Sequence, residues 1–193
     1  MFEDWSCTAS QIGVSDLGDK PMIFWYCIAR KINDIETSMT PAVIFLEQKG
    51  AQFQVLEYSH DQMTESYGLE AVEKLGLEAS AVFKTLVVAL DSGEHVVALV
   101  PSRNKLNMKQ LAKSAKAKKA TMAEVNKVQN MTGYILGGVS PFGQKKRLKT
   151  FVDSSAISHD LIYVSGGKRG LELQIVPTLL SEYLGATFVS IAE

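Results

Sequence analysis

One run of apolar and β-branched residues constrains the fold more than any other stretch of this 193-residue chain. Residues 81–90 read AVFKTLVVAL, a polar link with one glycine follows at 91–94, and residues 95–100 read HVVALV. Two strand-like runs around a short link of this kind predict a β-hairpin. We therefore expect a hairpin over residues 81–100.

A single lysine, Lys84, interrupts the first of these runs. In one interpretation, its side chain lies on the solvated face of a half-buried strand. In the other, it is a lone cation at the floor of a pocket, where neighbouring side chains exclude water from it. The strand pattern alone does not distinguish the two.

The chain changes in composition near residue 39. Both cysteines and both tryptophans lie in residues 1–38, and none follows. We interpret residues 1–38 as an appended, weakly structured arm and residues 39–193 as the working domain; a docking strand at 22–29 is the alternative. That apolar stretch has acids before it and Arg30-Lys31 behind it, the wrong order of charge for an export signal. A domain without cysteine favours the reducing cytoplasm, and no apolar run is long enough for a membrane span.

The working domain mixes helix and strand signals. Thr40 at an N-cap and Pro41 at the first helical position predict a helix that Gly50 ends. Alternation over residues 53–58 predicts a strand. The same reasoning predicts helices at 69–75, 107–115 and 177–184, and strands at 173–176 and 187–191.

Two glycine-rich segments, residues 132–145 and 162–171, each follow a short strand signal. Glycine pairs permit positive φ and expose backbone N–H groups that can bind an anion or a developing oxyanion. Ordinary tight turns are the plainer alternative. Gly143 is followed by Gln144 instead of lysine and a hydroxyl residue, so we exclude a nucleotide-hydrolysing P-loop.

Basic residues gather in two places although the formal net charge is only −1. Seven lysines and arginines lie between Glu94 and Glu124 with no acid among them, and a second cluster occupies residues 145–149. A solvated helix face is the usual explanation for such a run. A polyanion such as RNA is the functional alternative, for which the candidate contacts are Lys109, Lys113, Lys116, Lys145, Lys146 and Arg147.

The reactive groups of the domain are few. The three histidines lack metal-site spacing, so we predict no metal and place them at the surface. Glu70 and Glu73 are expected on a solvated helix face. Neither a serine elbow nor a cysteine nucleophile is present after residue 38. The remaining groups are Lys84, the glycine amides and the hydroxyls of Thr85, Ser140 and Ser165, which suit binding and polarising an ester next to a phosphate-rich ligand.

Several motifs together resemble the YbaK family of Cys-tRNA(Pro) deacylases, which are related to the editing domain inserted in bacterial prolyl-tRNA synthetases. The motifs are TPA at 40–42, FKTL at 83–86, TGY at 132–134, GGVSP at 137–141, GQKKR at 143–147 and YVSGGKRG at 163–170. Each is weak alone, but their order and spacing are specific and cover residues 39–193. The resemblance implies a compact mixed α/β (α+β) fold with a mostly antiparallel, barrel-like sheet and surrounding helices.

The resemblance also implies a site and an activity. Lys84 would be the residue that catalysis cannot lose, and the substrate-binding positions would be Tyr58, Tyr67, Thr85, Gly137, Gly138, Ser140, Ser165 and Gly166. The expected function is trans-editing removal of cysteine from Cys-tRNA(Pro), with Cys-tRNA(Cys) as a further substrate. We expect no cofactor, and we expect a prolyl-tRNA synthetase partner in a ternary complex.

Two questions stay open at this point. The attacking group is either water or the thiol of the substrate, which would make the enzyme a hydrolase or a lyase. The alternatives to Cys-tRNA(Pro) editing are a sibling Ala-tRNA(Pro) deacylase and a non-catalytic module that binds tRNA or a synthetase.

Overall fold

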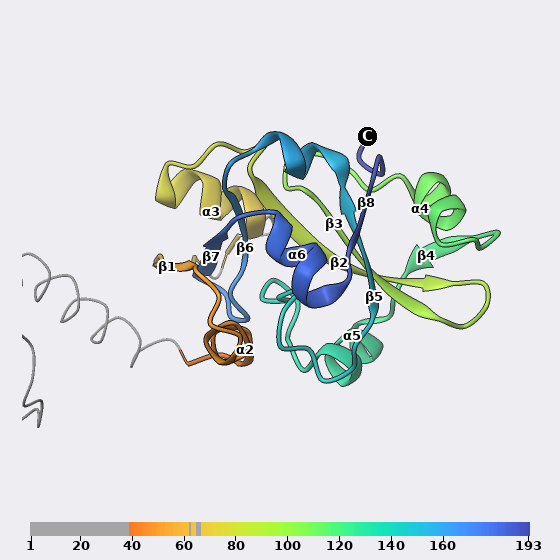
Figure 1. The fold of residues 1–193 in the computed structure, drawn as a ribbon, viewed down its shortest axis with the longest axis horizontal. Helices are drawn as coiled ribbons and strands as arrows, with labels where there is room; N and C mark the ends of the chain where they lie inside the picture. Colours follow the sequence, from red (N-terminus) through yellow and green to blue (C-terminus); the bar gives the residue numbers. More distant parts are fainter. Residues whose placement is uncertain (1–38, 62, 65–66) are drawn as a thin grey trace, which may run out of the picture. The chain divides into compact units, whose positions relative to one another are not determined.

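The computed structural model describes residues 39–61, 63–64 and 67–193, so the predicted arm over residues 1–38 lies outside the described residues (Figure 1). The helices are α2 (Pro41–Gln48), α3 (Tyr67–Leu75), α4 (Met108–Ser114), α5 (Val125–Thr132), the 3-10 helix η2 (Ser154–Ser158) and α6 (Thr178–Leu184). The strands are β1 (Gln54–Glu57), β2 (Val82–Leu90), β3 (His95–Pro101), β4 (Ala120–Met122), β5 (Lys149–Asp153), β6 (Ile162–Ser165), β7 (Leu171–Ile175) and β8 (Thr187–Val189).

The predicted hairpin is confirmed and lies at the centre of the sheet. The strand order is β1-β7-β6-β2-β3-β5-β8, and β4 pairs with the far end of β2. The β2/β3, β2/β4, β1/β7 and β6/β7 pairs are antiparallel, and the β2/β6, β3/β5 and β5/β8 pairs are parallel. The mixed α+β fold is therefore confirmed. The sheet is not closed, since among the described strands the end members β1 and β8 do not pair.

Helix α2 begins where the sequence predicts. The Thr40 hydroxyl accepts a hydrogen bond from the backbone N–H of Val43 at 3.3 Å, which satisfies one of the free donors of the first turn. The same hydroxyl donates to the carbonyl oxygen of Gly166 at 2.5 Å. This one side chain therefore caps α2 and ties it to the second glycine-rich segment.

The strand predicted before the first glycine-rich segment is wrong. A helix precedes it in place of a strand: α5 runs to Thr132 and ends at Gly133, which has φ 83°. Val128 and Met131 are three residues apart and both buried, so they share one face of a helix. A strand would instead bury every second residue.

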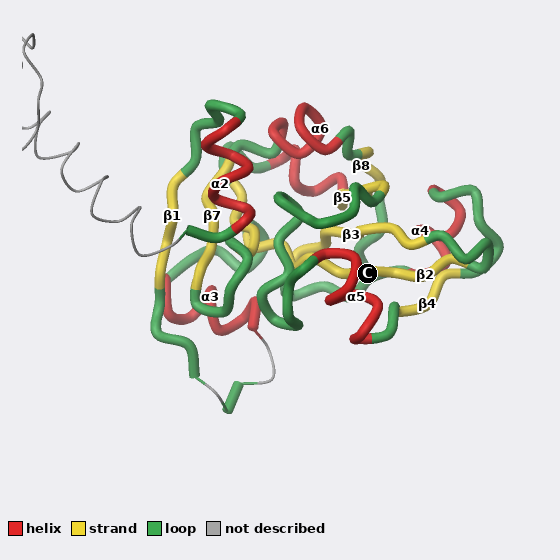
Figure 2. The backbone as a smooth tube through the Cα atoms, turned by 90° about the horizontal axis from the view of Figure 1, so that it is seen from below, coloured by secondary structure: helices red, strands yellow, loops and turns green. Residues whose placement is uncertain are grey.

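The two faces of the central hairpin pack against different elements. Phe83 and Val87 belong to a larger core cluster that also contains buried side chains of α2, α5 and α6. Val88 and Leu90 belong to a smaller cluster that includes buried side chains of α4. Figure 1 shows α4 and β4 at one end of the hairpin, with β1, α2 and α3 towards the other. Both helices, α2 and α3, lie beside β1 and β7 in the turned view as well (Figure 2).

None of the helices in the described ranges is long and apolar enough to cross a membrane.

Candidate functional site

Lys84 is held near the start of the central strand β2, away from the hairpin turn. Its side chain is half-buried, and its Nζ donates to the backbone carbonyl of Ser102 at 3.2 Å. Burial lowers the pKa of the Lys84 ammonium below its usual value. Within the described ranges, neither of the two ion pairs involves this lysine. Lys84 is thus a partly desolvated cation without a neutralising carboxylate.

Buried polar atoms without partners occur on β2, just after β3 and on β7. In the part of the chain that the structure describes, three buried side-chain oxygens make no hydrogen bond: Oγ1 of Thr85, Oγ of Ser102 and Oε2 of Glu172. Thr85 follows Lys84 in the chain, and Ser102 is the residue whose carbonyl holds Lys84. Buried polar groups are usually satisfied, so each of these exceptions has room for a further hydrogen-bond partner.

Strand register decides which of these groups share a face. The parallel register pairs Val82 with Tyr163 and Phe83 with Val164, so Lys84 and Ser165 follow on one face. Ser165 is in turn the antiparallel partner of Glu172, which therefore lies on that face too. Thr85 points to the opposite face, because successive residues of a strand alternate. The structure thus brings Lys84 and Ser165 together and turns the Thr85 side chain away from them.

Glu172 is a member of this face that the sequence analysis missed. Burial raises the pKa of its carboxyl from 4.5 to about 8. A carboxyl at this position can be neutral near physiological pH, or it can ionise when a cation arrives. Burial raises the pKa of Tyr58 to about 12, and the negative charges of Glu172 and Glu70 add to this shift.

Tyr67 and Gly137, two of the predicted substrate-binding residues, are in direct contact. Residues that line one site are expected to lie this close. A Cβ at Gly137, whose φ is 85°, would lie 2.7 Å from the Tyr67 ring. Arg169 completes this group: its guanidinium lies 4.8 Å from the ring centroid of Tyr67, and its Nε and Nη2 donate to the carbonyl of Leu136 at 3.1 and 3.0 Å. Arg169 belongs to the YVSGGKRG motif, so the sequence contained the signal that would have identified it.

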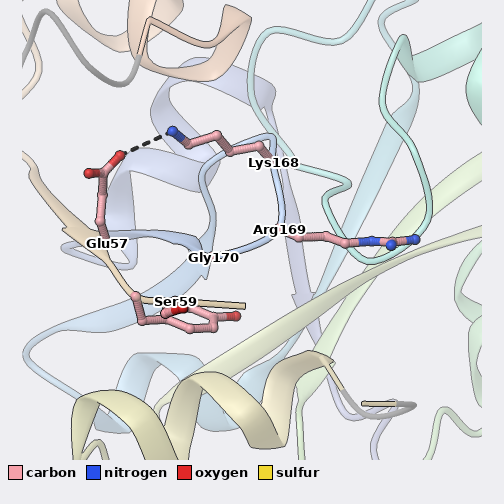
Figure 3. A pocket seen from close by; sticks show the side chains of 6 residues that line it. Glu57, Ser59, Lys168, Arg169 and Gly170 are labelled. Carbon is pink, nitrogen blue, oxygen red and sulfur yellow. Dashed lines mark hydrogen bonds and ion pairs between the residues drawn. The ribbon is translucent and has the colours of Figure 1, made fainter. Parts of the chain in front are cut away.

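Tyr58 lines a pocket of about 460 Å³ between the end of β1 and the loop before β7. Figure 3 shows Glu57 and Lys168 joined across one side of this pocket, at 3.1 Å, while Arg169 points the other way. The backbone N–H of Tyr58 donates to the carbonyl of Gly170 at 2.9 Å. Lys84 does not line this pocket, so the pocket and the lysine are separate features.

The expectations for His60 and Glu70 are wrong. Glu70 is buried and its carboxylate pairs with His60 Nδ1 at 2.8 Å, while its other oxygen accepts from the Asp61 N–H at 2.6 Å. The helix α3 therefore turns this acid inward to hold the preceding loop. Glu70 escaped notice because a three-residue spacing of acids looks like a solvated helix face.

The predicted glycine amides are mostly in use. The N–H of Gly138 donates to Ile135 O at 3.0 Å, and that of Gly166 donates to Leu171 O at 2.8 Å. The amide of Gly137 makes no backbone hydrogen bond to another described residue.

The Ser140 hydroxyl supports the loop from inside. Ser140 is fully buried, and its Oγ accepts a hydrogen bond from the Phe142 N–H at 3.3 Å.

The predicted tRNA-contacting cations fall into two separate groups. Lys109 and Lys113 lie on α4, and Lys116 follows it with φ 59°. This helix packs with Leu90, six residues beyond Lys84 and so roughly 20 Å along the strand. The second group, Lys145, Lys146 and Arg147, is exposed on the loop that also carries Gly137.

Comparison with known proteins now gives this arrangement a context. Residues 65–183 match the aminoacyl-tRNA editing domain family. The chain is 33% identical over 153 residues to EbsC of Enterococcus faecalis, a proposed Cys-tRNA(Pro)/Cys-tRNA(Cys) deacylase, covering 79% of this chain and 92% of that protein. It is 25% identical over 114 residues to the multifunctional Ser/Thr-tRNA deacylase ProXp-y of Escherichia coli K12, covering 58% and 66% of the two chains.

Solved structures share the fold. The crystal structure of a hypothetical protein superposes with a TM-score of 0.71 at 26% identity and covers 80% of this chain and all of that one. The crystal structure of a proposed trans-editing enzyme for prolyl-tRNA synthetase also gives a TM-score of 0.71, at 23% identity, covering 79% and 95%. The family resemblance predicted from the sequence motifs is confirmed.

Proposed function

The chain belongs to the aminoacyl-tRNA editing domain family, and from that premise we propose that it removes cysteine from mischarged Cys-tRNA(Pro), with Cys-tRNA(Cys) as a further substrate. Both relatives described above are named as deacylases, which supports cleavage of an aminoacyl ester on tRNA as the general reaction. They differ in the amino acid removed, and the choice of cysteine follows the more similar relative.

One observation carries the proposal: a partly desolvated lysine without a carboxylate partner is held by the carbonyl of Ser102 and shares a sheet face with the unpartnered oxygen of Glu172. The 3′ end of an aminoacyl-tRNA offers a phosphate, ribose hydroxyls and an ester, all of which a cation and hydrogen-bonding groups can hold. An ammonium in such a place interacts strongly with a bound anion because little water screens it. Lys84 would hold the terminal ribose and phosphate.

The chemistry can then be assigned group by group. The substrate thiol attacks the ester carbonyl carbon, and the Gly137 amide stabilises the oxyanion that forms. When the ester C–O bond breaks, the ribose oxygen takes the proton that the thiol has lost. The products are free tRNA and a cysteine thiolactone, which water opens later. If water attacks directly, the same groups serve and cysteine is released at once.

In this proposal, Glu172 would receive the amino end of the substrate. Its buried carboxyl has one oxygen without a partner and lies on the face that bears Lys84. The α-ammonium of an aminoacyl group would supply the missing partner and favour the ionised carboxylate. Tyr67, in contact with Gly137 and Arg169, would form one side of the proposed site.

The need for such an enzyme has a physical origin. Cysteine is small enough to enter a proline pocket, and a methylene or so of difference contributes only about 1–3 kcal/mol to discrimination. A separate site that clears the wrong ester makes up the shortfall. The two basic groups have no base-reading motif between them, so a prolyl-tRNA synthetase partner in a ternary complex would supply tRNA selection, in the cytoplasm where charging occurs.

The test is deacylation of Cys-tRNA(Pro), Ala-tRNA(Pro) and Ser-tRNA by the full chain at one stated salt concentration, with trapping of any thiolactone. We expect rapid loss of cysteine alone, with thiolactone formed before free cysteine. Equal loss of cysteine and alanine would contradict thiol-assisted specificity and indicate the sibling activity. Tight tRNA binding without loss of any amino acid would contradict the enzyme and indicate a binding module.

A further inference from the structure

A second pocket, of about 200 Å³, opens between α2, the segment over residues 141–150 that leads into β5, and α6. Two aromatic side chains, Phe45 and Tyr183, form part of its wall, and three cations, Lys49, Lys146 and Arg147, surround it. No carboxylate is among its lining residues. The pocket therefore combines apolar rings with concentrated positive charge.

The aromatic wall is well supported. The Phe45 ring stacks on Phe142, with centroids 6.0 Å apart, and meets Tyr183 edge to face at 6.4 Å. Phe142 is fully buried, while Phe45 and Tyr183 remain partly exposed at the pocket. Lys49 Nζ lies 6.0 Å from the Phe45 ring centroid. A flat ligand would meet rings that packing already holds in place.

The cations are available to a ligand. Within the described ranges, neither ion pair includes Lys49, Lys146 or Arg147. The backbone around two of them is fixed, because the Lys146 N–H donates to Met131 O at 2.8 Å. Arg147 adds a planar fork that matches the oxygens of a phosphate.

We propose that this pocket binds one unpaired nucleotide of a tRNA, with its phosphate at Lys146 and Arg147 and its base against Phe45 and Tyr183. Single-stranded RNA is recognised by this combination of stacking rings and a positive groove. An acidic peptide would use the cations but would leave the aromatic wall without a planar partner. The inference rests on the proposed function for the identity of the RNA. The loop that lines this pocket also carries Gly137, which connects the pocket to the proposed site.

The two halves of the pocket make separate predictions for binding of an uncharged tRNA(Pro) transcript to the full chain. The plot of log K against log salt has a negative slope, and removing one cation that binds a phosphate makes this slope less steep by about one. The double variant Lys146→Ala/Arg147→Ala should therefore make it less steep by about two. Tyr183→Leu should weaken binding roughly 5- to 150-fold, the decrease expected for one stacked base, with the slope unchanged. Tyr183→Phe, which keeps the ring, should bind like wild type.

The matched control is Lys118→Ala/Lys119→Ala, which removes the same charge from two adjacent exposed residues before β4. We expect it to bind almost as wild type does, with thermal unfolding showing that all variants are folded. Equal slopes for the two double variants would overturn the pocket, as would a Tyr183→Leu variant with wild-type affinity, which would indicate diffuse charge or an acidic protein partner. Deacylation by wild type is read separately: pocket-dependent binding without turnover would reject the proposed reaction and leave the nucleotide site standing.

Discussion

The buried carboxyl of Glu172 links the stability of the molecule to pH. Its pKa is about 8 in the folded protein against 4.5 ordinarily, so between these values the folded state keeps a proton that the unfolded state has lost. Raising the pH through this window therefore favours unfolding, by roughly 1 kcal/mol for each pH unit from this group.

Glu172→Gln has nearly the same shape and cannot ionise, so it should lack this contribution. Urea unfolding at pH 5, 6.5 and 8 should show the stability of Glu172→Gln rising relative to wild type at each step. Parallel pH curves for the two proteins would mean that the carboxyl is ionised in the folded state.

Gly137 is predicted to matter through the ring that it touches. Its φ of 85° matches the 86° of Gly93 in the hairpin link. A Cβ added at Gly137 would lie 2.7 Å from the Tyr67 ring, whereas one added at Gly93 would meet nothing within 4 Å. Both alanine variants should lose about 1–2 kcal/mol of stability from the left-handed backbone. Gly137→Ala should in addition lower kcat/KM about tenfold or more by displacing Tyr67, whereas Gly93→Ala should keep wild-type kcat/KM. Equal kcat/KM for the two would remove Tyr67 from the site.

At the scale of elements, α2 is held in place by a close approach of two backbones. A Cβ at Gly143, with φ 64°, would lie 2.3 Å from the carbonyl oxygen of Pro41, the first residue of α2. Gly50 has the same φ and open space around it. Gly143→Ala should therefore be about 1–3 kcal/mol less stable than Gly50→Ala in urea unfolding, which is the usual cost of overpacking. Similar stabilities would show that the loop moves freely away from α2.

Elements with local signals could be predicted from the sequence, and those that depend on distant partners could not. The Thr40 cap and the hairpin link carry their own turn chemistry, so α2 and the β2/β3 pair were predicted correctly. Strand β4 has three residues and becomes a strand only by pairing with the end of β2. Likewise, the inward turn of Glu70 depends on His60, which approaches it through a loop.

At the scale of the whole molecule, the sheet connects segments that the sequence keeps far apart. The parallel β2/β6 pair places Ser165 beside Lys84, and β7 then adds Glu172. The motifs predicted that Lys84 and Ser165 belong to one site, because the family resemblance covers both. Nothing in the residues themselves indicated Glu172, since its effect depends on burial that only the assembled sheet provides.

We propose that this fold presents Lys84 for catalysis, and single-turnover deacylation of Cys-tRNA(Pro) tests this role most directly. The comparison is between wild type, Lys84→Ala and Lys119→Ala, where Lys119 is an exposed lysine just before β4. Lys84 is only half-buried and its Nζ donates to a single backbone carbonyl, so Lys84→Ala should remain folded, which thermal unfolding checks. We predict that it loses about 100-fold or more in rate, as expected for removal of a group that stabilises the reacting centre, while Lys119→Ala keeps the wild-type rate. A folded Lys84→Ala protein with substantial activity would contradict the account.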